Sequence, residues 1–142
     1  MKIPPRIHFS LMPLWLSLGL LAAPVLADDL VAYSTTAMAI TGDIEIDDFG
    51  ITFANGTHMV FDDLVADHFV VDGQPVYSSV YSMEDPQDPV LENGNRLCGS
   101  GRVTYLATWG DADVTTLAVF TTQDVPASSA DMCASYSFTS LY

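Results

Sequence analysis

The chain has 142 residues, which is room for one domain of ordinary size, and it contains 18 Asp and Glu residues against four Lys and Arg. Its formal net charge of −14 argues against nucleic acid and anionic membrane surfaces as partners, because phosphate groups are bound by Lys and Arg. Carboxylates also keep a protein hydrated in salty surroundings, so the charge by itself indicates solubility and not an activity.

The N-terminus has the layout of a secretory signal peptide. Lys2 and Arg6 form a basic start, Phe9–Leu21 is almost entirely apolar, and Pro24 precedes Val25-Leu26-Ala27, whose residues suit a cleavage site. The apolar run is shorter than the roughly 20 residues that span a bilayer, which favours a cleaved leader over a retained membrane anchor. We therefore predict a signal peptide over residues 1–27 and a single domain over residues 28–142, located in the bacterial periplasm or secreted.

Removal of the leader increases the charge imbalance. All 18 acidic residues lie after residue 27, where the only Lys or Arg residues are Arg96 and Arg102. The predicted domain therefore has a formal charge of −16 and contains no lysine.

Short β-branched and aromatic runs between turn signals predict an all-β domain of about seven or eight strands, with no helical stripe. The hairpin signals are Asn55-Gly56, Asp72-Gly73 and the turn at 110–113. The expected strand regions are 32–46, 51–54, 57–61, 64–71, 76–83, 102–109, 114–121 and 133–138.

Two longer segments are predicted to be loops. Residues 84–95 contain two prolines, a glycine and four acidic residues, and residues 123–131 form the other loop. An antiparallel meander of this size forms either a small β-barrel or a β-sandwich, and the sequence leaves both open.

Cys98 and Cys133 are the only cysteines. An even count in an oxidising compartment predicts one disulfide bond, and neither residue has a His or a second Cys at metal-ligand spacing. The bridge would join the entry of the 102–109 strand to the start of the last strand, so we expect those strands side by side or across a corner.

No catalytic constellation is recognisable, and we expect a protein that is not an enzyme and has no cofactor. Cys98-Gly99-Ser100-Gly101 lacks the residue order of a nucleophile elbow. His58 and His68, expected on neighbouring strands, have no third metal ligand. Calcium bound by surface carboxylates is the one alternative, although no cluster has EF-hand spacing. The clusters are Asp43, Glu45, Asp47 and Asp48; Asp62, Asp63 and Asp67; Glu84, Asp85 and Asp88; and Asp111 with Asp113.

Arg96 and Arg102 flank Cys98 in an otherwise anionic domain, and two interpretations stay open. In the structural one, each arginine pairs with nearby carboxylates and fixes the disulfide loop. In the functional one, they form a small positive spot that binds a carboxylate or phosphate. Tyr105 and Trp109 would have to lie beside them to complete a sugar- or peptide-binding patch, so these four residues are the candidate ligand site.

Several short motifs are similar to those of other proteins. They are Ile40-Thr41-Gly42-Asp43, the Asn93–Gly99 stretch NGNRLCG, Val103–Ala107, and Cys133 three residues before Tyr136. Their combination resembles small, uncharacterised exported proteins of proteobacteria, over most of the predicted mature chain. The resemblance implies a periplasmic or secreted domain with one disulfide, and it implies no activity.

The predicted function is a non-catalytic binding or interaction module, whose partner is a protein or a small anionic ligand. The alternative is an acidic inhibitor of a cationic hydrolase such as lysozyme. In that case the charge would steer association, and the 84–95 loop would enter the cleft of the enzyme.

Overall fold

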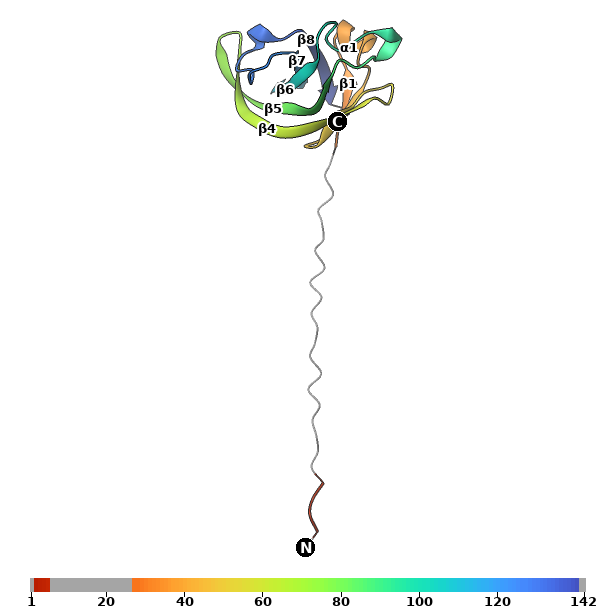
Figure 1. The fold of residues 1–142 in the computed structure, drawn as a ribbon, viewed down its shortest axis with the longest axis vertical. Helices are drawn as coiled ribbons and strands as arrows, with labels where there is room; N and C mark the ends of the chain where they lie inside the picture. The colour runs from red at the N-terminus through yellow and green to blue at the C-terminus, as the bar shows by residue number, and fades with distance from the viewer. Residues whose placement is uncertain (1, 6–26, 141–142) are drawn as a thin grey trace.

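The structure is a computed structural model that describes residues 2–5 and 27–140. It confirms the all-β fold and shows that the architecture is a closed barrel of eight antiparallel strands (Figure 1). Each strand pairs with the next one in the sequence, and the last strand pairs with the first. The predicted signal peptide lies almost entirely outside the described residues. Within the described part of the chain, no helix is long and apolar enough to cross a membrane.

Most of the predicted strand runs are confirmed, but the run at 32–46 is wrong because residues 35–39 are helical, and the runs at 57–61 and 64–71 form one continuous strand. The strands are β1 (Asp28–Ala32), β2 (Ile44–Ile46), β3 (Gly50–Thr52), β4 (His58–Val71), β5 (Gln74–Gln87), β6 (Val103–Asp111), β7 (Val114–Phe120) and β8 (Ala134–Ser140). Asn55-Gly56 and Asp72-Gly73 form the predicted turns. Positive φ angles at Asp72 and Gly73, 50° and 78°, are those that a tight hairpin turn requires.

The structure also contains three short helices, α1 (Thr35–Ala39) and the 3-10 turns η1 (Glu92–Gly94) and η2 (Ser129–Asp131), and α1 lies within the run predicted as a strand over 32–46. The hydroxyl of Ser34 caps α1 by accepting the amide of Ala37 at 3.2 Å. A single helical turn is too short to produce an apolar stripe with a 3.6-residue period, which is why the sequence pattern did not indicate it.

The barrel interior is filled by side chains. Leu106 of β6 is paired with Val119 of β7, Leu117 of β7 is paired with Tyr136 of β8, and all four are buried. The rings of Phe61 and Tyr81 stack at 4.1 Å on the other side of the core. Side chains fill the interior of small eight-stranded barrels in this way, which leaves the ends and the outside of the barrel for binding surfaces.

A second apolar cluster covers the outer face of β5, β6 and β7. Val80, Ala107 and Ala118 lie on paired positions of these strands and are buried together with Phe69 and Phe120. The far end of the β4–β5 hairpin curves over this face and meets the segment after β7 (Figure 1), where the amide of residue 70 donates to the carbonyl of residue 127 at 2.9 Å.

The predicted disulfide between Cys98 and Cys133 is present, with a Cα–Cα distance of 5.7 Å. Its half-cystines precede β6 and β8. Those two strands are not adjacent, because β7 lies between them and pairs with both. The bridge therefore spans β7 at one end of the barrel and ties the connection between β5 and β6 to the start of β8.

Replacement of both cysteines by serine should lower the free energy of unfolding by about 3–4 kcal/mol, because the bridge no longer restricts the unfolded chain. The melting temperature should fall by on the order of 10–20 °C. Intact-mass spectrometry of the wild-type protein should show two hydrogens fewer than the reduced chain. A double variant with the same melting temperature as the wild-type protein would contradict a stabilising bridge. The control is Ser135→Ala, on the exposed side of β8.

Candidate functional site

The connection between β5 and β6, residues 88–102, closes one end of the barrel, and we call it the clasp. Leu91 and Leu97 point into the main core and are 4% and 0% exposed. The structure therefore differs from the loop predicted over 84–95 in two respects. β5 continues through Gln87, and the following residues pack on the barrel because the apolar side chains at 91 and 97 need burial.

Hydrogen bonds attach the clasp to the connection between α1 and β2. The side-chain amides of Asn93 and Asn95 donate to the carbonyl of Ala39 at 3.0 and 3.4 Å. The amide of Glu92 donates to the carbonyl of Ile40 at 3.0 Å. Figure 1 shows the short helix of the clasp beside α1 at the same end of the molecule. The middle of the clasp is therefore bonded to the C-terminal end of α1.

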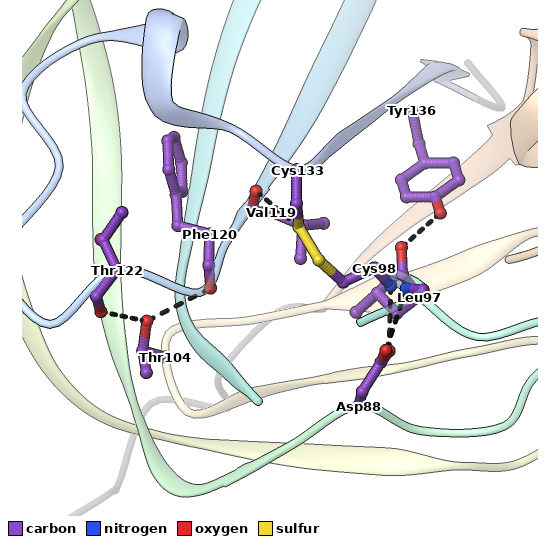
Figure 2. The surroundings of a disulfide bond; sticks show 10 residues. Asp88, Leu97, Cys98, Thr104, Val119, Phe120, Thr122, Cys133 and Tyr136 are labelled. Atoms are coloured by element: carbon purple, nitrogen blue, oxygen red, sulfur yellow. Dashed lines mark hydrogen bonds between the residues drawn. A yellow bond between two sulfur atoms is a disulfide. The ribbon is translucent and has the colours of Figure 1, made fainter. Parts of the chain in front are cut away.

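The carboxylate of Asp88 organises the base of the clasp. One of its oxygens accepts the backbone amide of Cys98 at 2.9 Å, and the other accepts that of Gly99 at 2.9 Å (Figure 2). Hydrogen bonds to an ionised acceptor are stronger than those between neutral groups. Asp88 therefore fixes the start of the 98–102 turn, although most of that turn is exposed.

Tyr136 of β8 supports the clasp from inside the barrel. Its hydroxyl donates to the carbonyl of Leu97 at 2.5 Å, and the residue is 2% exposed. Burial, with a smaller contribution from the negative charge of Asp88, raises the pKa of Tyr136 to about 12. The phenol thus stays protonated, and remains a donor, throughout the ordinary pH range.

Arg96 and Arg102 line one cleft of about 600 Å³ at the outer side of the clasp. The other walls are the end of β5, residues 85–88, and the turn Gly99-Ser100-Gly101. Arg96 donates from Nη1 to the carbonyl of Asp88 at 2.7 Å, so it does help to fix the clasp. The expected ion pairs with carboxylates are not present. In residues 27–140, the one ion pair within 4.0 Å joins His68 to Asp67.

The two candidate aromatic residues lie elsewhere. Tyr105 and Trp109 pack on the outer apolar cluster, where the Trp109 ring is 5.5 Å from that of Phe69. The hydroxyl of Tyr105 donates to the carbonyl of Gln123 at 3.3 Å. The structure thus brings the two arginines together in one cleft, and it places neither aromatic residue among the side chains that line it.

Neither histidine is arranged as a metal ligand. The prediction that they lie on neighbouring strands is wrong, because both lie in β4. A strand rises about 3.3 Å per residue, so two histidines ten residues apart in it are too far from each other to bind the same metal ion. His58 shares a hydrogen bond with the hydroxyl of Thr52 at 2.8 Å. Among the described residues, no group of three or more His, Cys, Asp or Glu side chains is placed to hold a metal ion, so the suggested calcium site gains no support.

Comparisons of the chain with models of protein families, with curated proteins and with solved structures give no match. The resemblance to small exported proteins of proteobacteria stays a prediction. A function for this protein is therefore inferred from the geometry of the clasp and its cleft.

Replacement of Asp88 by Asn should destabilise the protein by about 1–3 kcal/mol, because one of the two amides loses its acceptor and the other loses a charged one. Urea unfolding measures the change. Asp111→Asn, at an exposed position beside the β6–β7 turn, is the matched control and should stay within about 0.5 kcal/mol of the wild-type value. Equal losses in the two variants would show that the Asp88 contacts do not hold the clasp.

Tyr136 should make unfolding sensitive to alkaline pH. Its pKa is about 12 in the folded protein against an ordinary value of 10.0, so its contribution is complete below about pH 10 and is lost as the pH rises through 12. Tyr136→Phe should abolish this part of the pH dependence and cost about 1–3 kcal/mol at neutral pH, since the carbonyl of Leu97 loses its donor. Denaturant unfolding at several pH values tests this, with Tyr77→Phe, which is 83% exposed, as the control.

Proposed function

We propose that this chain is an exported, non-catalytic binding module, and that its binding site is the cleft between the end of β5 and the clasp. The cleft takes an anionic group, carried by a small ligand or by a partner protein. One observation carries the proposal: the only two arginines of residues 28–142 line the same cleft, and neither is within ion-pair distance of a described carboxylate.

The chemistry of guanidinium groups supports an anionic ligand. Each presents several N–H donors in a planar fork that matches a carboxylate or a phosphate. Arg102 makes no hydrogen bond to another described residue, and Arg96 uses one donor on the carbonyl of Asp88. Most N–H donors of the two arginines are therefore available to a ligand. The hydrogen bonds that involve Asp88 fix the backbone near Arg96.

We also propose that the protein acts in an oxidising compartment. The Cys98–Cys133 bridge requires an oxidising environment for its persistence, and the signal-peptide layout of residues 1–27 directs the chain to one. The periplasm and the exterior of the cell are both such environments. A binding module there meets small metabolites, peptides and the exposed parts of other exported proteins.

An acidic inhibitor of a cationic hydrolase is the second candidate, and the excess of 18 acidic residues over two arginines after residue 27 favours it. The segment expected to enter an enzyme cleft is bonded to the barrel, so inhibition would have to act through the folded acidic surface. This alternative predicts that an excess of the protein slows lysozyme at low salt and that the effect disappears at high salt. Unchanged lysozyme activity at low salt would eliminate it.

The anion site is tested by nuclear magnetic resonance titration of the purified protein with acetate and with inorganic phosphate. Backbone signals of residues 96–102 should shift in a saturable way. Arg96→Gln with Arg102→Gln should weaken binding by about tenfold or more, because charge-assisted hydrogen bonds are lost. Gln74→Glu with Gln123→Glu changes the net charge equally at exposed positions outside the cleft and is the matched control. Saturable binding that the arginine variant retains, or no saturable binding, would refute the proposal.

A further inference from the structure

The arginine cleft adjoins a second hollow with acidic side chains. This hollow has a volume of about 560 Å³ and shares Asp85 and Gln87 with the arginine cleft. The end of β5 is thus a common wall of the two. Neither arginine lines the second hollow, whose ionisable side chains are His58, Glu84 and Asp85.

The carboxylates of the second hollow are available to a ligand. Glu84 and Asp85 are exposed, and neither forms an ion pair within the described part of the chain. The side-chain amide of Gln87 donates to Asp85 at 2.5 Å, which orients that carboxylate on the shared wall. Both guanidinium groups therefore line the arginine cleft alone, Glu84 lines the second hollow alone, and Asp85 lies on the wall between the two.

The remaining lining of the second hollow suits the stem of a long side chain. Met59 and Pro89 contribute to its walls, and Val60 is 43% exposed there. Lysine and arginine side chains bury an aliphatic stem along such surfaces and keep the charged end in water. The exposed side chain of Val60, in the same hollow as Glu84 and Asp85, is complementary to that side chain.

The net charge restricts the ligand further. A domain with a formal charge of −16 repels polyanions, whereas a ligand with one anionic group and a compensating cation is not repelled. The α-ammonium and the carboxylate of a free amino acid share one carbon, so a cation for the acidic hollow has to come from a side chain. A peptide chain can place the two charges one or more residues apart.

We infer that the site binds the C-terminal end of a peptide, with the terminal carboxylate at Arg96 and Arg102 and a nearby Lys or Arg side chain at Glu84 and Asp85. This inference rests on the proposed function and adds the class of ligand. Capture of a C-terminal carboxylate is a recurrent mode of peptide recognition. Here the acidic hollow supplies the selectivity for a basic residue close to the terminus.

The test uses isothermal titration calorimetry of the purified protein with three synthetic pentapeptides. The first has a lysine two positions before a free C-terminal carboxylate, the second is its C-terminal amide, and the third has glutamate in place of the lysine. We expect the first to bind, the amide to bind about tenfold more weakly, and the glutamate peptide to bind about fivefold more weakly or worse.

Variants locate the basic subsite. Glu84→Gln should weaken the lysine peptide by about threefold and leave acetate binding unchanged, because Glu84 lines the acidic hollow and not the arginine cleft. Asp111→Asn removes the same charge at the exposed β6–β7 turn and is the control. Circular dichroism confirms that each variant is folded.

The outcomes separate this inference from the proposed function. Arginine-dependent acetate binding without a preference for the lysine peptide would overturn the inference and leave the anion site in place. An amide peptide that binds as well as the free acid would also overturn it. If no carboxylate binds, both the inference and the proposed function fail.

Discussion

Two backbone amides, those of Cys98 and Gly99, converge on the carboxylate of Asp88, and the arrangement of the clasp depends on this contact (Figure 2). Buried leucines at 91 and 97 hold the clasp against the core, and the disulfide ties it to β8. Those contacts fix where the segment lies. Asp88 fixes the conformation of the turn, because its carboxylate accepts hydrogen bonds from two backbone amides that would otherwise have to be hydrated.

The position of the arginines follows from the clasp. Arg96 lies between the buried Leu97 and the asparagines bonded near α1, and it also donates to the carbonyl of Asp88. Arg102 leads directly into β6. Both are attached to backbone that is bonded on either side, so a ligand would not have to order a free loop. That lowers the entropic cost of binding to a small exposed cleft.

Features encoded locally could be predicted from the sequence, and those that depend on distant contacts could not. Asn55-Gly56 and Asp72-Gly73 formed the expected turns because their conformational preference acts within two residues. The choice between barrel and sandwich depended on three paired positions between β1 and β8, which are far apart in the chain. No single-sequence pattern indicates that Asp88 accepts amides ten and eleven residues later.

The candidate site was predicted in part for the same reason. The two arginines were singled out by their rarity, and they share a cleft because the clasp folds back on the end of β5. Tyr105 and Trp109 were the aromatic residues that a sugar- or peptide-binding patch would have needed beside them, and alternation places both on one face of β6. Alternation could not show that the β4–β5 hairpin and the segment after β7 would cover that face with a second apolar cluster.

We propose that the two guanidinium groups act as one site. The most direct test follows the side-chain Nε–Hε signals of Arg96 and Arg102 by nuclear magnetic resonance while a peptide with a free C-terminal carboxylate is added to the oxidised protein. Both signals should shift along one saturation curve with a single dissociation constant. Signals that shift with different dissociation constants, or an Arg102 signal that does not move while that of Arg96 does, would contradict it.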